Sequence, residues 1–488
     1  MLTGLLIVFP LVAALVVLFL RNHVARNAAL FFSVVEFALA VAALIQFKTN
    51  PAAEILSLNC TWVSSVGIKF AVALDGISIL LLILTTFLVP LILLSSFANP
   101  YNRPHSFYSL ILIMQMALVG VFVARDGFLF YVFWELALIP IYFICLLWGG
   151  ENRAKITFKF FVYTLLGSLF MLVALIYLYN NTGLNQLPKS WAIDDLYSAG
   201  RSLSPEKQSM IFWFIFLAFA IKMPVFPLHT WQPDTYVTAP TQGTMLLSGI
   251  MLKMGTFGLI RWLIPVVPQA VEQWAPIAIG LSVVGIIYAS CIAIVQKDYK
   301  RLIAYSSIAH VGLISAGILS MNQQGLQGGV VQMLSHGVNV VGLFLIADIL
   351  FRKLGTRKME ELGGIRNINP SFAVLFLIVL LGSVALPLTN GFVGEFLLIA
   401  GVFSYGKITA AFAGLTVILG AVYMLRSYQK IMLGEANTLT AAFGNLVKTD
   451  QIVLWVICAV IIVLGVYPKP INDLAGPAVA ELLKSIGK

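Results

Sequence analysis

The sequence has 488 residues, of which 60% are hydrophobic and only 10% are charged, whereas about 25% of the residues in an ordinary soluble domain are charged. A chain of this composition has too little polar surface to face water on all sides, which excludes a soluble globular fold. The formal net charge of +10 suits basic loops beside lipid headgroups, and we expect no nucleic-acid partner.

Apolar stretches of about 20 residues, the length that crosses ~30 Å of hydrocarbon, recur along the whole chain. They are continuously apolar and lack the two-residue alternation of barrel strands, which favours helices. The sequence therefore predicts an all-α polytopic membrane protein with about 14 transmembrane helices. The predicted spans lie near residues 2–20, 28–47, 72–97, 107–124, 127–148, 157–180, 209–230, 241–263, 275–296, 302–320, 325–351, 372–404, 408–430 and 451–467.

The first span is expected to be a retained helix rather than a signal peptide, because its apolar run is long and its basic residues follow it. If the spans alternate from an N-terminus outside, more of the 30 lysines and arginines fall in inside loops than in outside segments. One such inside loop holds Lys297, Lys300 and Arg301. This bias predicts that both termini lie on the outer side of the membrane.

Cysteine spacing gives no sign of a metal or redox centre. Cys60, Cys145, Cys291 and Cys458 lie far apart, without a CxxC pair or a histidine at ligand spacing. No glycine-rich phosphate loop is present, and no strand pattern exists to carry one. We therefore expect no metal and no cofactor in this chain.

Ionisable residues inside the predicted spans are the strongest functional signal. A charge at the membrane centre costs at least ~2.5–3.5 kcal/mol, so such residues usually face a bundle interior or a water-filled cavity. A purely structural scaffold has no need for so many of them. The residues are Glu36, Glu135, Lys222, His229, Lys253, His310, His336, Asp348 and Glu395.

Two of these residues lie in the fifth and seventh spans. Glu135 is flanked by apolar residues on both sides, which disfavours the alternative of a solvated carboxylate at a helix end. Lys222 precedes Pro224 and Pro227, which interrupt the helical hydrogen bonds. The freed carbonyls need water or side-chain partners, so we expect a polar cavity at membrane depth. The alternative is a lysine that extends to the membrane interface.

The eighth and twelfth spans carry the next two. Lys253 lies in the middle of GIMLKMGTFG (249–258), whose glycines allow close helix packing. The segment LPLTNGFVGEF (386–396) repeats the interrupted pattern and contains Glu395. Interrupted spans five helices apart suggest a duplicated five-helix unit, and paired discontinuous helices indicate a transport path.

The remaining candidates are weaker. His310 and His336 lie in segments polar enough to hold water, and the unperturbed imidazole pKa of about 6.5 suits proton transfer. Either histidine can equally be a packing residue, as can His229 near its helix end. Asp348 precedes a basic cluster and is expected to be a solvated end residue, and Glu36 has no polar neighbour in the sequence that suggests a role.

Five segments resemble the antiporter-like subunits of proton-pumping NADH:quinone oxidoreductase, or respiratory complex I. The segments are FWELALIPIYF, AFAIKMPVFPLHTWQPDTYVTAPTQGTMLLSGIMLKMGTFGL, YSSIAHVG, QMLSHGV and NGFVGEF, within roughly residues 75–435. Related antiporter-like chains typically carry lysine where this chain has Glu395. That glutamate, together with the single final helix, favours the M-type branch of the family.

The resemblance implies two inverted five-helix repeats, helices 4–8 and 9–13, in which helices 7 and 12 are discontinuous. It divides the chain into four parts. These are N-terminal helices 1–3 (residues 1–106), a first repeat (107–264), a second repeat (275–432), and a C-terminal helix and tail (450–488).

The resemblance also implies a buried Glu/Lys/His axis that moves protons, driven by quinone reduction elsewhere in the complex. Glu135 and Lys222 would form the first pair, Lys253 the central relay and Glu395 the exit-side group. His310 and His336 would join the hydrated axis, and His229 is added as a candidate from its place near the interrupted helix. The expected proton-carrying residues are therefore Glu135, Lys222, His229, Lys253, His310, His336 and Glu395.

The implied partners are the other membrane-arm subunits of complex I, including two related antiporter-like subunits on either side. Membrane lipids, protons and internal water complete the set, and the implied location is the bacterial cytoplasmic membrane with periplasmic termini. Three alternatives stay open. They are a subunit of a multi-chain sodium/proton antiporter, a subunit of a membrane-bound hydrogenase with the same fold, and an inert membrane scaffold.

Overall fold

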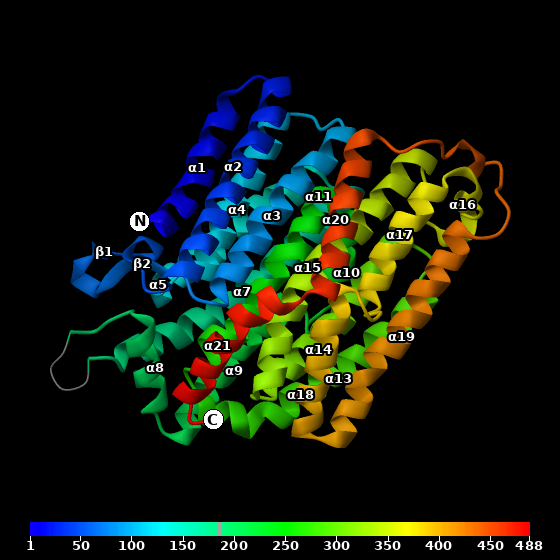
Figure 1. Ribbon diagram of the computed structural model, residues 1–488. Helices are drawn as coiled ribbons and strands as arrows, with labels where there is room; N and C mark the ends of the chain where they lie inside the picture. Colours follow the sequence, from blue (N-terminus) through cyan, green and yellow to red (C-terminus); the bar gives the residue numbers. More distant parts are fainter. Residues whose placement is uncertain (184–187) are drawn as a thin grey trace.

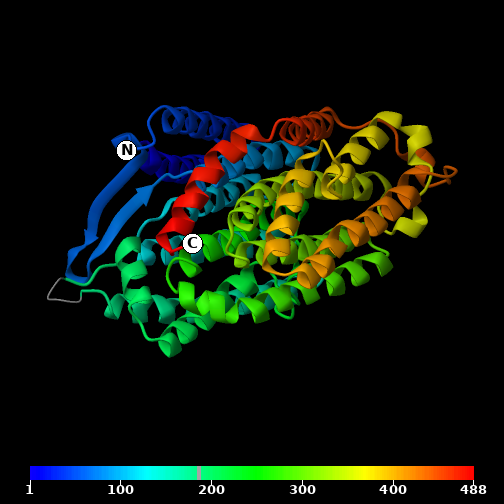
Figure 2. The same ribbon diagram turned by 60° about the horizontal axis from the view of Figure 1, so that its bottom comes forward.

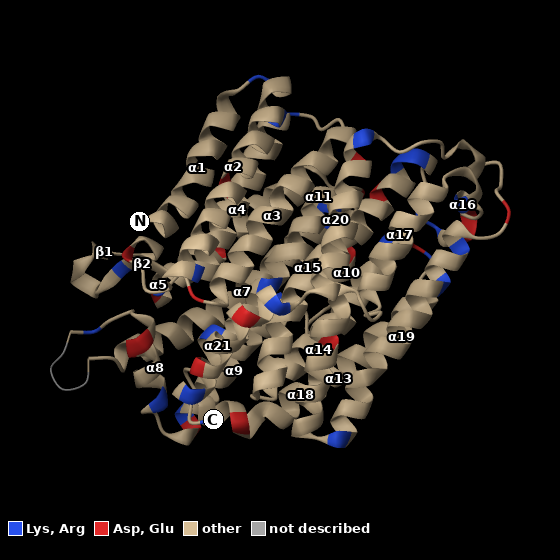
Figure 3. Cartoon of the chain, viewed as in Figure 1, with Lys and Arg blue, Asp and Glu red and all other residues tan. Residues whose placement is uncertain are grey.

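The computed structural model describes residues 1–183 and 188–488 and shows a bundle of long helices (Figure 1). Twelve helices among the described residues are long and apolar enough to cross a membrane. Many charged residues lie in loops and near helix ends, and a smaller number lie within the helices (Figure 3). The predicted all-α polytopic fold is confirmed. The total of about 14 spans, the inverted repeats and the four-part division of the chain stay predictions.

The described residues of the first half of the chain form nine α-helices and two strands. They are α1 (Leu2–Phe19), α2 (Asn22–Thr49), β1 (Ser57–Val63), β2 (Ile68–Ala73), α3 (Ser78–Ser95), α4 (Pro104–Val123), α5 (Gly127–Leu136), α6 (Leu138–Trp148), α7 (Arg153–Asn180), α8 (Ile193–Arg201) and α9 (Pro205–Lys222).

Among the described residues, the second half contributes twelve further α-helices, and two π-helical segments flank α12. They are α10 (Gln232–Thr238), α11 (Thr241–Leu246), η5 (Leu247–Met251), α12 (Leu252–Gly258), η6 (Leu259–Leu263), α13 (Pro268–Val295), α14 (Tyr299–Leu319), α15 (Gln323–Leu354), α16 (Ile365–Ile368), α17 (Pro370–Ser383), α18 (Asn390–Tyr405), α19 (Lys407–Met432), α20 (Lys448–Val466) and α21 (Lys469–Ser485).

A β-hairpin stands where the sequence indicated no strand. β1 pairs antiparallel with β2, with Leu58 opposite Val72, and the hairpin projects from one side of the bundle (Figure 2). β1 is mostly exposed and β2 is half-buried against the helices, so neither strand carries a strong alternating pattern. The predicted start of the third span at residue 72 is wrong, because α3 begins only at Ser78.

The seventh span is interrupted as predicted. α9 ends at Lys222, and residues 223–231 separate it from α10. Pro224 and Pro227 follow the lysine directly, and proline has no N–H to continue the helical ladder.

The twelfth span is interrupted between Ser383 and Asn390. Ala385 and Leu388 in this segment adopt left-handed backbone angles, with φ of 56° and 71°. Side chains with a Cβ rarely adopt this conformation, so the helical hydrogen bonds stop here and α18 starts anew. The predicted discontinuity therefore lies at the position expected from the sequence.

The predicted C-terminal tail is a helix, α21, which lies across the ends of neighbouring helices (Figures 1 and 2). Arg201 donates a hydrogen bond of 2.8 Å to the carbonyl of Ser485, and Lys488 lies 2.9 Å from Glu272. Gln327 donates to Asn472 at 3.1 Å. These contacts attach the end of the chain to both halves of the bundle.

A carboxylate at the same end of the bundle joins three segments of the chain. Asp75 accepts hydrogen bonds from the backbone of Ile77 and Ser78 and so caps α3. The Arg125 guanidinium lies 2.6 Å from it, and Arg261 makes a second ion pair. Burial raises the pKa of Asp75, but the two arginines and the backbone donors outweigh this effect and hold the pKa well below its usual value.

Asp75→Asn is expected to destabilise the folded protein by about 2 kcal/mol, between the values for exposed and buried ion pairs. Because the folded-state pKa is depressed, the stabilisation is present above the unfolded pKa of about 4 and is lost as the pH falls below it. Thermal unfolding of the detergent-solubilised protein should show a gap from wild type that is constant from pH 7 down to about pH 4 and narrows only as the pH falls further. An unchanged gap would contradict the ion-pair role, and Asp473→Asn, at an exposed position of α21, serves as the control.

Candidate functional site

Close packing of α15 against α18 sets the position of Glu395. A Cβ atom at Gly394 would lie 2.9 Å from the Cα of Gln332, and one at Gly328 would lie 2.7 Å from the backbone nitrogen of Leu398. Only glycine permits these approaches. The carboxylate on α18 is thereby brought directly against the polar side of α15.

Glu395 is almost fully buried and contacts two polar side chains. Gln332 donates a hydrogen bond of 3.1 Å to its Oε1. His310 Nδ1 lies 2.9 Å from the same oxygen, although its ring N–H is not aligned for a hydrogen bond. The contact becomes an ion pair whenever His310 is protonated.

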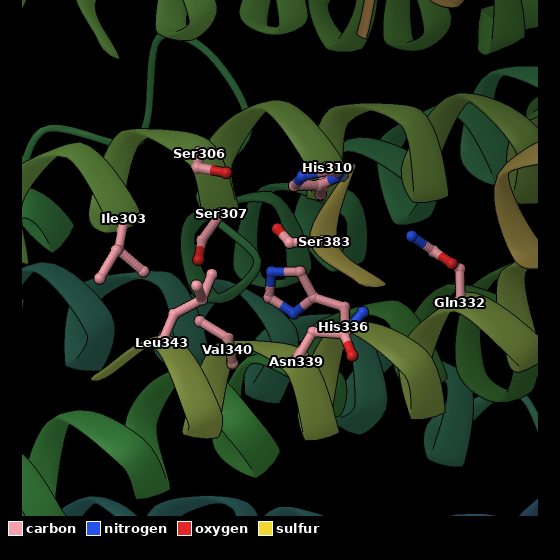
Figure 4. Close-up of a pocket in the computed structure, with 10 residues that line it drawn as sticks. All are labelled: Ile303, Ser306, Ser307, His310, Gln332, His336, Asn339, Val340, Leu343 and Ser383. Atoms are coloured by element: carbon pink, nitrogen blue, oxygen red, sulfur yellow. The ribbon is translucent and has the colours of Figure 1, made fainter. Parts of the chain in front are cut away.

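The rings of His310 and His336 face each other across a small cavity, with centroids 5.9 Å apart. Figure 4 shows His336 in its centre, with Gln332 toward one end and Ile303 and Leu343 toward the other. The cavity holds about 10 Å³, which is close to the space that one water molecule needs. Its walls are formed by Ile303, Ser306, Ser307, His310, Gln332, His336, Asn339, Val340, Leu343 and Ser383.

Lys253 continues this row of polar side chains. It is fully buried, donates a hydrogen bond of 2.7 Å to the carbonyl of Ser248, and lies 2.8 Å from His336 Nδ1. The π-helical segments on both sides of α12 are of a kind that often occurs at functional sites. A Cβ at Gly337 would lie 2.9 Å from the carbonyl of Gly249, so these two glycines let the backbones meet beside the Lys253–His336 contact.

Lys222 lies where the end of α9 packs against α12, the helix that carries Lys253. A Cβ at Gly255 would lie 2.9 Å from the carbonyl of Phe219, which places the end of α9 against α12. Lys222 is 3% exposed, and its Nζ lies 5.3 Å from the centre of the Trp134 ring. It is therefore buried at the helix break and does not extend to the interface.

Glu135 occupies the last turn of α5 and is half-buried. Its Oε1 has no hydrogen-bond partner among the described residues. The charges of Glu135 and Lys222 act on each other, but the hydrogen bonds and ion pairs of the described residues do not join them directly. The structure brings these two side chains into one neighbourhood without a contact.

His229 is buried but packs against aromatic rings. Its ring stacks on Phe226 at 5.7 Å and meets Tyr288 at 5.2 Å between centroids. No described residue makes a hydrogen bond to its Nδ1. The structure thus separates His229 from the contacts that join His310 and His336.

The expectation that Asp348 is a solvated end residue is wrong. It is 8% exposed, receives a hydrogen bond of 2.6 Å from Thr241, and lies 2.7 Å from Arg352 Nε. Arg352 also contacts Asp450 at 2.6 Å. Asp348 and Arg352 lie four residues apart on α15, a spacing that favours an ion pair, whereas the contact with Asp450 on α20 joins segments that are distant in the sequence. Glu36 is fully buried, and its oxygens have no hydrogen-bond partner among the described residues.

Two neutral residues of the row, Gln332 and Ser383, were not singled out from the sequence, whereas Ser307 belongs to a segment that was expected to hold water. Gln332, Ser307 and Ser383 line the cavity, but isolated neutral polar side chains occur in many membrane helices. Lys300 was placed in an inside loop, yet it lies in the first turn of α14 and is 3% exposed. The available sign of its burial was its position three residues, or about one helical turn, before the apolar Ile303.

Comparison with known proteins gives a consistent result. The model of the NADH:quinone oxidoreductase/Mrp antiporter transmembrane family matches residues 124–420. NADH-quinone oxidoreductase subunit M of Rickettsia prowazekii is 38% identical over 484 residues, which cover 98% of this chain and 97% of the relative.

Two solved structures share the fold. A chain of respiratory complex I from Thermus thermophilus is 30% identical, with a TM-score of 0.91 over 100% of both chains. A chain of the Mrp complex from a Dietzia species has a TM-score of 0.85 at 20% identity, over 100% of this chain and 99% of that one. The second likeness concerns the fold alone. Because the family model covers more than half of the sequence and a clear relative spans nearly all of it, the chain belongs to the NADH:quinone oxidoreductase/Mrp antiporter family of multi-pass membrane proteins.

Proposed function

We propose that this chain is a proton-translocating membrane subunit of NADH:quinone oxidoreductase. The observation that carries the proposal is the buried row Lys253, His336, His310 and Glu395, hereafter the polar row. Its successive members are separated by 2.8 Å, by 5.9 Å between ring centroids, and by 2.9 Å. Such a row is costly within a membrane, and it crosses from α12 through α15 and α14 to α18. Its geometry suits proton transfer between helices.

Two of the three steps in the polar row occur at hydrogen-bond distance. A proton on Lys253 can pass to His336 Nδ1, and one on His310 can pass to Glu395. The histidine rings are too far apart for direct transfer, and the small cavity between them suits a bridging water. Buried polar atoms normally have partners. Within the described part of the chain Asn339 Oδ1, Glu395 Oε2 and both amide atoms of Asn390 have none, which supports water along the row.

The first half of the chain would load this row. Lys222 takes up a proton with ionised Glu135 nearby, and separation of the two changes the affinity of the lysine for its proton. At an effective dielectric constant of ~20, two unit charges ~8 Å apart interact by ~2 kcal/mol, or more than tenfold in proton affinity. The proton then passes through Lys253 toward Glu395. His229 is given no step, because it packs among aromatic rings.

The driving reaction belongs to other chains in this proposal. Quinone reduction elsewhere in the complex supplies the energy, and this chain holds no cofactor. Relatives named as subunits of NADH-quinone oxidoreductase support membrane-arm partners, with related antiporter-like subunits on either side. We place the chain in a bacterial cytoplasmic membrane with both termini on the periplasmic side.

Sodium/proton antiport by a multi-chain complex is the second candidate, favoured by the shared fold of the Mrp chain. The glutamate at position 395, where antiporter chains typically carry lysine, weighs against it. A subunit of a membrane-bound hydrogenase with this fold stays an alternative. Proton pumping that is indifferent to sodium concentration supports the first proposal, and obligatory sodium exchange contradicts it.

Glu135→Gln is expected to abolish most proton pumping by the assembled complex, because the neutral amide cannot change the proton affinity of Lys222. General acid–base steps typically contribute 10²–10⁴-fold. We would measure proton uptake by inverted vesicles during NADH oxidation, with NADH-dependent quinone reduction and assembly on native gels. Wild-type pumping in an assembled variant would show the proposed path to be wrong. Glu206→Gln, at an exposed position in the first turn of α9, should pump normally.

Glu395→Gln and Glu395→Asp separate charge from shape at the end of the polar row. The glutamine variant keeps a hydrogen-bond partner for Gln332 but loses the ionisable group, so pumping should fall by at least ~10-fold. The aspartate variant keeps the charge on a shorter side chain and should retain more pumping than the glutamine variant. The same vesicle assay would decide, and the reverse order of the two variants would refute a proton-carrying role.

A further inference from the structure

The cavity of the polar row has an apolar end that no proposed step explains. Ile303, Val340 and Leu343 line it on the side away from Gln332 (Figure 4). Ile303 and His310 lie two turns apart on one face of α14, and Lys300 lies one turn before Ile303 on the same face. The helix therefore aligns Lys300 with the cavity, behind a single apolar layer.

Lys300 is a buried cation held by neutral oxygens. It is 3% exposed, and its Nζ donates hydrogen bonds to the carbonyls of Ala239 at 2.8 Å and Val237 at 3.4 Å. The charged groups near it are Asp348, Asp298 and Arg357, and the uncharged thiol of Cys145 is also close. Arg357 and Asp298 pair with each other at 3.3 Å, so Asp348 is the remaining anion that faces it.

Asp348 belongs to a network that reaches the protein surface. It shares Arg352 with Asp450, at 2.7 and 2.6 Å, and Asn99 donates to it at 3.1 Å. Arg352 is 16% exposed at its side chain. Together with Lys300, these three charged groups sum to zero when the lysine is protonated and to −1 when it is neutral. The network therefore attracts a proton back to Lys300 whenever the lysine has released one.

We propose that Lys300 is an additional proton-binding residue, at the end of the polar row where α14 begins. In this inference, which rests on the proposed function, water at this end of the bundle protonates the Lys300 amine. The ammonium then gives the proton to water that crosses the layer of Ile303, Val340 and Leu343 and reaches His336. The carboxylates of Asp348 and Asp450 balance the charge while the proton is held. Predicted topology places this end on the cytoplasmic side.

A purely structural role for Lys300 makes a different prediction. The ammonium also satisfies the carbonyls at the end of α10, which any side chain with suitable donors can do. Arginine has five donors and keeps its charge, but it does not release a proton in proteins. Lys300→Arg therefore preserves a structural role and abolishes a proton-binding one, whereas Lys300→Met removes both.

The test measures protons pumped per NADH oxidised in inverted vesicles that contain the whole complex. We expect both Lys300→Arg and Lys300→Met to lower pumping at least ~10-fold while native gels show normal assembly. Wild-type pumping by Lys300→Arg would overturn the proposal. If the larger arginine prevents assembly, Lys300→Gln replaces it, since the amide keeps donors without an exchangeable ammonium proton, and wild-type pumping there is equally decisive against the proposal.

Two further variants show which inference has failed. Lys297→Arg, three residues before Lys300 and 73% exposed at its side chain, should pump normally. If Lys300→Arg pumps normally while Glu395→Gln does not, the role of Lys300 is wrong and the polar row stands. If Glu395→Gln also pumps normally, the proposed function itself is wrong.

Discussion

The cost of placing polar groups in hydrocarbon governs the rest of this structure. A lysine or carboxylate at the membrane centre must face other polar groups or water, and a buried backbone carbonyl must find a donor. The protein meets both needs at once at Lys253, whose ammonium contacts the Ser248 carbonyl and His336. Polar groups that would be unfavourable singly are gathered into one row, and that row is where chemistry can occur.

Small residues and helix interruptions make this gathering possible. Gly249 and Gly337 let α11–η5 and α15 approach until backbone atoms meet, and Gly394 does the same for α18 against α15. The breaks after Lys222 and before Asn390 end helical hydrogen bonding inside the bundle. The freed backbone groups there need polar side chains or water as hydrogen-bond partners. Close packing and interruption thus produce the same result, which is a polar interior between apolar outer faces.

Charged networks hold the two ends of the bundle in different ways. At one end Asp75 joins the start of α3 to Arg125 and Arg261, close to α21. At the other end Arg352 joins Asp348 and Asp450 and so connects α15 with α20. The first network has two cations and one anion, and the second has two anions and one cation. The second therefore suits a neighbouring lysine that exchanges its proton.

The sequence by itself determined the solvent, the helical class and most candidate residues. Composition excludes water as the surrounding medium, and each of Glu135, Lys222, Lys253 and Glu395 was visible because a charge in an apolar run is conspicuous. The interrupted helices were equally visible, since Pro224 and Pro227 have a local backbone effect that does not depend on neighbours. These features can be recognised from the sequence because the apolar character of a span and the missing N–H of proline are both properties of a short stretch of chain.

Only the tertiary structure decided which of these residues meet. His310 and Glu395 are far apart in the chain and become neighbours through the packing of α14 with α18. The ring of His229 packs against aromatic side chains instead. The hairpin and the burial of Asp348 and Lys300 were also hidden, because each depends on contacts with distant segments. Spacing along one helix specifies a shared face, but contacts between helices depend on how side chains and glycines fit across the bundle.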